Sequence, residues 1–237
     1  MLDWRLDGGV TLTATTERRE AKDALFEGFA TIAQALASGR RVEIVEVLAQ
    51  GERTVEDIAE TIGQSVANTS HHLRTLARAG LVVTRREGTH IHYRVASDGV
   101  VTVWLGIRSL AADQLDAIED LARTYLGDRD DLEVIGRDEL EDRLRLGDLV
   151  LIDVRPEVEY SAGHLPGAIS IPPDALNRLD EFLPTIPEDE DIVAYCRGPY
   201  CVFADGAIRY LADRGRRAVR LEEGVPEWSR AGGRIET

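Results

Sequence analysis

The chain has 237 residues, of which 43% are hydrophobic and 30% charged, a length and composition that suit a soluble protein of two ordinary domains. It has no run of 18 or more apolar residues and no apolar signal-peptide core at its N-terminus, so neither a transmembrane helix nor a signal peptide is expected. A net charge of −15 argues against indiscriminate nucleic-acid binding by the whole chain. We therefore expect a cytoplasmic protein without membrane contact, in which thiols stay reduced.

The first half of the chain is predicted to be mostly helical. Residues 1–20 mix glycine, threonine and charged residues with weak periodicity, which indicates an N-terminal arm or a short hairpin. Apolar residues then recur at helical spacing over residues 23–38. Three shorter helices are expected to follow, over residues 40–49, from Thr54 to Gly63 and from Ser65 to Ala79.

A β-hairpin and a long helix complete this half. Residues 81–86 and 90–95 alternate in side-chain character and flank Gly88, a pattern typical of a hairpin. An amphipathic helix is expected over residues 100–125. Short helices followed by a hairpin in this order are typical of a winged helix-turn-helix, a fold that reads DNA. We predict such a mostly α domain for residues 21–126.

Positive charge gathers on the helix at 65–79 and on the hairpin after it. Residues 65–95 contain five arginines and one acid in an otherwise acidic chain. The helix is expected to bury Leu73, Leu76 and Ala77 and to turn its polar side outward. The side chains expected to contact base edges or phosphates are Ser65, Asn68, Thr69, Ser70, His71, Arg74, Arg85, Arg86 and His90. The expected partner is a double-stranded DNA operator; the alternative is a solvated basic surface.

The stretch SVANTSHHLRTLARAGLVVTRREGTHIHYRV, from Ser65 to Val95, resembles the recognition helix and wing of the arsenic-repressor (ArsR) family of bacterial transcription factors. The resemblance implies a homodimer held through the first and last helices of the domain, here residues 23–38 and 100–125. A monomer that buries the same apolar stripes internally is the alternative.

The residues with which many ArsR proteins bind metals are missing. The family's thiolate motif in the third helix is replaced by ERTVEDI, and the last helix has acidic residues but no histidine. A soft metal requires thiolate or imidazole ligands. His90 and His92 share a strand face but lack a third ligand. We expect neither a metal site nor a cofactor.

Residues 127–131 are polar and are predicted to be a linker to a second domain, residues 132–237. In this domain the apolar runs LVLIDV, AISIP, DIVAYC and AVRLEE alternate with helical stretches at 138–145, 174–182, 201–213 and 225–231. Strands that alternate with helices indicate an α/β domain with a mostly parallel sheet.

Both cysteines of the chain, Cys196 and Cys201, lie in one loop between a predicted strand and a predicted helix. A thiol between a strand end and a helix start meets free backbone N–H groups and the helix dipole, and both favour an anion. We therefore expect a lowered pKa for Cys196, with Arg197 as a neighbouring positive charge. Gly198 and Tyr200 are expected to belong to the loop that cradles the anion.

The segment LIDVRPEVEYSAGHLPGAISIP resembles the first signature of the rhodanese sulfurtransferases, and EEGVPEWSRAGG resembles their closing motif with Glu223 in place of a glycine. The resemblance implies that Cys196 accepts sulfane sulfur from a small donor such as thiosulfate or polysulfide and becomes a persulfide. Arg197 is then expected to help bind an anionic donor. The residues expected to be structural in the signature are Asp153, Arg155, Glu159 and His164.

Three functions follow from these motifs. One is a regulator whose DNA affinity is coupled to the sulfur state of Cys196. Another is an active sulfurtransferase that the winged helix localises, and the third is an inactive rhodanese domain that docks other proteins. Cys201 either resolves a persulfide into a bridge with Cys196 or packs as a small buried side chain. Phosphate chemistry is disfavoured, because Val202 stands where phosphatase relatives need an arginine.

Overall fold

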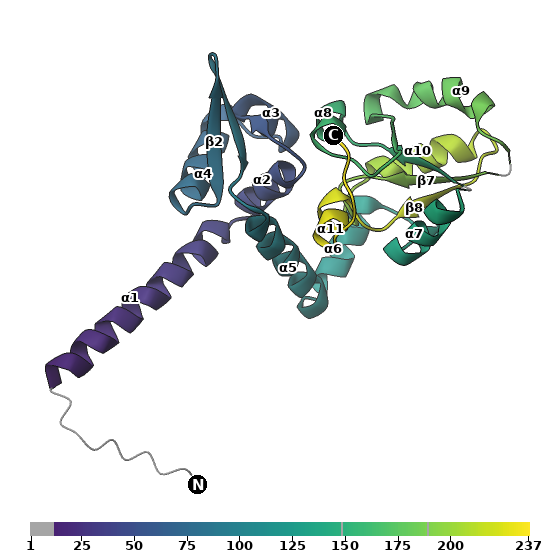
Figure 1. Cartoon of the computed structure of the whole chain (residues 1–237). Coiled ribbons are helices and arrows are strands. Elements are labelled where there is room, and N and C mark those ends of the chain that lie inside the picture. The colour runs from purple at the N-terminus through teal and green to yellow at the C-terminus, as the bar shows by residue number, and fades with distance from the viewer. Residues whose placement is uncertain (1–11, 148, 189) are drawn as a thin grey trace, which may run out of the picture.

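The computed structural model describes residues 12–237 except 148 and 189, with the side chains described from residue 15. Two domains lie side by side, and helix α1 projects from the first of them (Figure 1). The elements of the first domain are α1 (Leu12–Leu36), α2 (Gly39–Ala49), β1 (Arg53–Thr54), α3 (Val55–Thr61), α4 (Val66–Arg78), β2 (Val82–Glu87), β3 (His90–Val95), α5 (Asp98–Gln114) and α6 (Ala117–Leu126).

The first domain is a winged helix-turn-helix, as predicted. Its three strands form an antiparallel sheet in the order β1-β3-β2, with Gly88 at the hairpin turn in a left-handed conformation (φ 61°). Thr54 caps α3 in a reciprocal capping box with Asp57, and Ser65 caps α4. The helix-turn-helix packs on one hydrophobic core that includes Leu73.

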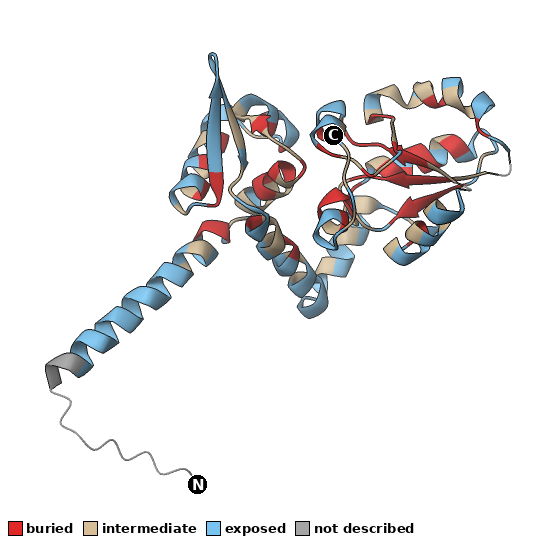
Figure 2. Cartoon of the chain, in the orientation of Figure 1, coloured by how far each residue is buried: buried red, intermediate tan, exposed pale blue. Residues whose placement is uncertain are grey.

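Helix α1 is longer than predicted. It begins at Leu12 and not at residue 23, so residues 12–20 of the expected arm or hairpin are helical, while residues 1–11 lie outside the described part. Residues 15–29 are exposed (Figure 2), and residues 12–20, LTATTERRE, contain too few apolar side chains to show a helical periodicity in the sequence. An ion pair between Arg19 and Asp23, one turn apart, supports the helix locally.

The helix predicted over residues 100–125 is two helices. Leu115 adopts an extended conformation (φ −118°, ψ 97°) and separates α5 from α6. The apolar spacing continues through this residue, so periodicity alone did not reveal the break. Because of it, α6 turns back beside α5, and the two helices line an apolar groove of about 470 Å³ with Trp104 from α5 and Tyr125 from α6 among its walls.

The second domain contains a five-stranded parallel sheet in the order β4-β8-β7-β5-β6, which confirms the predicted α/β architecture. Its elements are β4 (Val134–Ile135), α7 (Arg137–Leu146), β5 (Leu149–Asp153), α8 (Glu157–Ala162), β6 (Ile169–Ser170), η1 (Pro173–Arg178), α9 (Leu179–Phe182), η2 (Leu183–Thr185), β7 (Asp191–Tyr195), α10 (Phe203–Ala212), β8 (Ala218–Leu221) and α11 (Val225–Arg230). The short edge strand β4 was not predicted.

Helices cover both faces of this sheet, and its three central strands, β8, β7 and β5, are mostly buried (Figure 2). Successive residues of β7 point to opposite faces. Ala194 and Cys196 therefore join the core beneath α10, whereas Val193 and Tyr195 join the core that contains Trp228 of α11. Within the described residues, no helix is both long and apolar enough to cross a membrane.

Candidate functional site

The two thiols face each other inside one loop. Cys196 directly follows β7, and α10 begins two residues after Cys201. Both cysteines are free, and their side chains are hydrogen-bonded to each other. Cys196 is 2% exposed and Cys201 is 9% exposed. The pair is thus almost removed from solvent, with Cys201 the more accessible member.

Backbone amides surround both sulfur atoms. The N–H groups of Gly198 and Ala204 donate to Cys196, and those of Arg197 and Phe203 donate to Cys201. Ala204 and Phe203 belong to the first turn of α10, whose N–H groups have no partner within the helix. The loop therefore provides the amide cradle that its position between strand and helix predicts.

The charge in this pair lies on Cys201. Burial raises the pKa of Cys196 well above its usual value, and the hydrogen bond with Cys201 adds to this effect. The hydrogen bond from Cys196 lowers the pKa of Cys201 to about 7, with further help from the two amides and from the charge of Arg197. The expectation of a lowered pKa at Cys196 is therefore wrong, because Cys196 is the deeper and more strongly desolvated thiol.

Tyr200, expected in the anion cradle, directs its ring toward Arg108 of α5, whose guanidinium carbon lies 6.0 Å from the ring centroid. Arg129 binds the same loop and the start of α10 through three hydrogen bonds. Its Nη1 donates to the carbonyl of Pro199 (2.7 Å), its Nη2 donates to the carbonyl of Cys201 (2.6 Å), and its Nε donates to Asp205 (2.6 Å). Arg129 lies in the segment predicted as a linker, where no local pattern distinguishes it.

Two glycines allow the loop to pack. Gly198 has φ 126°, and a Cβ there would lie 3.1 Å from a carboxylate oxygen of Glu227. A Cβ at Gly224 would lie 2.5 Å from the carbonyl carbon of Arg197, so α11 reaches the loop only because residue 224 has no side chain. Glu223, which replaces the preceding glycine of the closing motif, forms an ion pair with Arg137.

The signature residues form a buried polar frame. Arg155 donates to both carboxylate oxygens of Asp153 and to the carbonyl of Gly163, and both charged side chains are fully buried. His164 stacks on Tyr160 with ring centroids 3.8 Å apart. These contacts brace the segment around α8, which faces the thiol loop.

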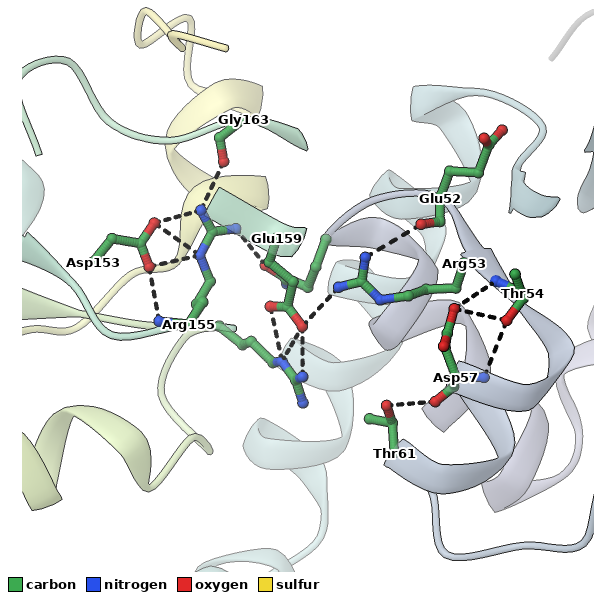
Figure 3. Close-up of polar contacts among 11 residues, drawn as sticks. Glu52, Arg53, Thr54, Asp57, Thr61, Asp153, Arg155, Glu159 and Gly163 are labelled. Atoms are coloured by element: carbon green, nitrogen blue, oxygen red, sulfur yellow. Dashed lines mark hydrogen bonds and ion pairs between the residues drawn. The ribbon is translucent and has the colours of Figure 1, made fainter. Parts of the chain in front are cut away.

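The same frame connects the two domains (Figure 3). The fully buried Glu159 accepts hydrogen bonds from Nε and Nη2 of Arg197, the shortest at 2.6 Å, and its Oε1 lies 3.1 Å from Nη2 of Arg53 in the winged helix domain. Arg155 donates to Gln50 at the end of α2 (3.1 Å). Arg53 is 4% exposed and directly precedes Thr54, the cap of α3. Sequence reasoning treated the domains separately and missed this junction.

A small cavity of about 140 Å³ lies between the thiol loop and the winged helix domain. Cys201 and Arg197 line it from the loop, and Glu43 and Glu46 line it from α2. Burial raises the pKa of Glu46, while the charges of Arg108 and Arg197 partly oppose that rise. Nearby, Arg108 of α5 forms an ion pair with Glu227 of α11.

The predicted DNA-contacting residues are mostly on the surface. The exposed ones are Ser65, Asn68, His71, Arg74, Arg85, Arg86 and His90, and Ser70 is half-buried. Thr69 is fully buried, and its Oγ1 donates to the carbonyl of Ser65, so the expectation that it contacts DNA is wrong. It shares its helix face with Leu73, one turn later. Ala77, expected in the core, is exposed.

The arginines of the wing already have partners. Arg85 donates to Glu52 (2.6 Å) and to Glu87 (2.8 Å), and Arg86 donates to the carbonyl of Gly88 (3.1 Å). The charge of Arg85 is therefore balanced in the free protein, while that of Arg86 remains available to a phosphate. Among the described residues, no group of three or more His, Cys, Asp or Glu side chains is arranged to hold a metal ion.

Known proteins resemble each domain and also the combination of the two. The family model for the rhodanese-like domain matches residues 136–231, and the model described as bacterial regulatory protein, arsR family, matches residues 38–84. The HTH-type transcriptional regulator Rv0324 of Mycobacterium tuberculosis is 43% identical over 213 residues, which cover 90% of this chain and 92% of that protein.

Two further similarities concern single domains. A sulfurtransferase of Allochromatium vinosum is 31% identical over 86 residues, 36% of this chain and 76% of that protein. A solved homodimeric winged helix-turn-helix DNA-binding domain, Mb0332 of Mycobacterium bovis, is 41% identical and covers 40% of this chain and 89% of its own, with a TM-score of 0.39. The match to Rv0324 along both domains, together with the two family models, shows that the chain belongs to the arsR family of bacterial regulatory proteins and carries a C-terminal rhodanese-like domain.

Proposed function

We propose that this protein is a DNA-binding transcriptional regulator whose affinity for its operator depends on the sulfur state of the Cys196–Cys201 pair. A regulator similar along 90% of the chain supports the first part of the proposal. The exposed polar side of α4 and the wing provide the surface for DNA. The rhodanese-like domain, with two facing thiols among backbone amides, supports the second part.

The chemistry proposed for the pair is the transfer of sulfane sulfur. A donor persulfide R–S–SH gives its outer sulfur to the Cys196 thiol, which becomes Cys196–S–SH while the donor leaves as the thiol R–SH. One S–S bond breaks and one forms, so no separate oxidant is needed. The amides of Gly198 and Ala204 are placed to stabilise the persulfide once it ionises.

The observation that carries the coupling is the position of Glu159 between Arg197 and Arg53. Arg197 is the residue after the acceptor thiol, and Arg53 is the residue before the cap of the helix-turn-helix. An added sulfur atom needs space in a loop where Cys196 is almost fully enclosed. A loop that moves to make this space shifts Arg197, and the shared carboxylate passes the change to Arg53.

The segment 52–54 distributes this change to both parts that face DNA. Thr54 caps α3, and β1 pairs with β3 of the wing through Arg53 opposite Tyr93. Glu52 holds Arg85 of the wing. One short segment therefore contacts the rhodanese signature and the helix-turn-helix (Figure 3), and through β3 and Arg85 also the wing.

We further propose that the protein acts as a homodimer through α1 together with α5 and α6. Apolar side chains on these helices have no cover in the single chain, and α1 stands away from the body of the molecule (Figures 1 and 2). The exposed apolar residues include Leu25, Phe26, Phe29, Leu110, Leu121 and Tyr125. Exposed apolar stripes of this kind are typical of interfaces, and a dimer places two recognition helices on two half-sites.

The enclosure of the thiols favours regulation over rapid turnover. Cys196 is 2% exposed, and the cavity in front of the pair is closed on one side by α2 and α3. A bulky acceptor has little access to such a site. This favours a domain that holds sulfur as a signal over one that releases it quickly.

The test is a set of dissociation constants for operator DNA, selected from a random-sequence library with the full-length protein. Each is measured with reduced and with polysulfide-treated protein, for wild type, Cys196→Ser and Cys201→Ser. We expect a shift of about 5- to 150-fold in wild type, the usual range of allosteric coupling, and none in Cys196→Ser. Unchanged affinity with rapid sulfur transfer to cyanide would instead indicate an enzyme. Unchanged affinity without transfer would indicate a docking domain.

A further inference from the structure

We infer that Cys201, and not Cys196, is the nucleophile that first takes sulfur from the donor, and that it then passes the sulfur to Cys196 behind it. The inference rests on the proposed function, since it requires that the thiol pair accepts sulfane sulfur. It reverses the order that the rhodanese resemblance implies for the two positions.

Access to the pair leads through Cys201. Of the two thiols, Cys201 lines the 140 Å³ cavity between the domains, and it is also the more exposed one. Both thiols belong to the core beneath α10, but Cys196 is the more deeply buried of the two, and its sulfur faces Cys201 and two amides. A donor that enters the cavity therefore meets Cys201 first.

Cys201 is also the better nucleophile at neutral pH. Its pKa is lowered to about 7, so at pH 7.4 roughly 70% of it is thiolate, whereas a thiol with the usual pKa of 9.0 is only about 2% thiolate. The pKa of Cys196 lies above that usual value. Because a thiolate of lower pKa is intrinsically less nucleophilic, the roughly 30-fold advantage in thiolate falls to about fourfold in rate. Its better access to the cavity adds to this.

The cavity favours a small donor without a negative head group. Glu43 and Glu46 contribute carboxylates to its wall. Arg197 directs Nε and Nη2 to Glu159, so it is engaged within the protein and not placed to hold a thiosulfate dianion, the role that the resemblance suggested for it. A protonated persulfide fits this setting better, since it brings no charge into a partly buried acidic wall.

The proposed sequence balances without an oxidant. The thiolate of Cys201 attacks the outer sulfur of R–S–SH, the donor S–S bond breaks, and the electron pair leaves with R–S⁻, which takes up a proton from solvent. Sγ of Cys196 then attacks the outer sulfur of the neutral Cys201–S–SH. The Cys196 proton moves to Sγ of Cys201, which leaves with the electron pair of the broken S–S bond. The new Cys196–S–SH releases its proton to solvent, and the resulting persulfide anion is held by the amides of Gly198 and Ala204.

The test follows sulfur uptake by the full-length protein in a quenched-flow experiment with inorganic disulfide (Na₂S₂) as donor. Unreacted thiols and persulfides are trapped with N-ethylmaleimide, and mass spectrometry locates the added sulfur. We expect the first sulfur on Cys201, normal uptake on Cys201 in the Cys196→Ser variant, and uptake at least about fourfold slower in Cys201→Ser. Thiosulfate is expected to react more slowly than disulfide. The two serine variants differ only in position, so each serves as the control for the other.

The inference is overturned if Cys201→Ser takes up sulfur at the wild-type rate, or if the first sulfur appears on Cys196; either result leaves the proposed function intact. If wild type accepts no sulfur on either thiol, both the proposed function and the relay fail. Alkylation of the untreated protein by iodoacetamide measures the accessibility of each thiol separately from sulfur uptake. In that case, faster alkylation of Cys201 than of Cys196 shows only that Cys201 is the more accessible thiol.

Discussion

Replacement of Arg53 by methionine tests the junction between the domains. The substitution keeps an unbranched side chain of similar length and removes the guanidinium. In the structure this group is almost fully buried, and its Nη2 lies 3.1 Å from Oε1 of Glu159. Arg53 also donates to the carbonyl of Glu52 (3.2 Å).

The expected effect on stability is moderate. Removing one partner of a buried ion pair costs about 3–5 kcal/mol when the other charge is left uncompensated. Here Glu159 keeps Arg197, which binds it through two nitrogens. We therefore expect a loss below that range, about 1.5–3 kcal/mol, the value of a hydrogen bond to a charged group.

The effect on coupling is expected to be much larger. Arg53 is buried at the domain junction, so reduced Arg53→Met should bind operator DNA within about threefold of wild type, a difference of about 0.7 kcal/mol. The sulfur-dependent change in affinity, expected to be 5- to 150-fold in wild type, should fall below about twofold. Only the link between the sites is removed, while each site remains.

The assay is fluorescence anisotropy with labelled operator DNA and full-length protein, before and after polysulfide treatment. Arg145→Met provides a matched control, since Arg145 is exposed on α7 and pairs with Asp142. This control should keep the full sulfur response. If folded, persulfidated Arg53→Met also keeps it, the ion-pair route between the domains is refuted.

Three further outcomes are expected. Glu159→Gln leaves the buried guanidinium of Arg53 and the partly buried one of Arg197 without their carboxylate, so denaturant unfolding should show a loss of about 3–5 kcal/mol; a loss below about 1 kcal/mol contradicts this. Arg86→Ala should weaken DNA binding at all sequences and reduce the salt slope by about 1, whereas Arg85→Ala should change the slope less, because Glu52 already balances its charge; equal slopes for the two variants argue against this view of the wing. Because the thiolate is the reactive form and the pKa of Cys201 is about 7, the alkylation rate of Cys201 should rise with pH through a midpoint near 7. A midpoint near 9 would contradict the assignment of the thiolate to Cys201.

Local signals explain why much of the first domain was predictable. Thr54 and Asp57 sit at the spacing of a capping box, and Gly88 sits in a turn that requires a left-handed residue. Such features depend on a few neighbouring residues, so the sequence displays them directly. Thr69 shows the limit, because a polar residue on the core face of an amphipathic helix looks the same in sequence as one that faces solvent.

The contacts between distant segments had no local signal. Arg129 lies in a polar stretch, and only the fold brings it under the thiol loop, about 70 residues later in the chain. Arg53 and Glu159 belong to different domains, and each reads as an ordinary charged residue in its own segment. Leu115 continues an apolar periodicity while its backbone leaves the helix.

The sulfur site was predictable in outline but not in its charge. A strand end facing a helix start predicts amides around the loop, and four amides do donate to the two sulfur atoms. Which thiol ionises depends on how deeply each is buried and on the hydrogen bond between them. These are properties of the packed loop, and the sequence alone places both thiols in the same environment.

The most direct measurement is the ratio of two dissociation constants for one operator, determined with wild-type protein that mass spectrometry shows to be either fully reduced or persulfidated on the loop. A ratio of fivefold or more, returned to one by dithiothreitol, is what a thiol loop tied to the helix-turn-helix through Glu159 requires. If the reduced and persulfidated forms have the same dissociation constant, the rhodanese-like domain carries sulfur without changing the DNA affinity of the winged helix domain, which contradicts the account.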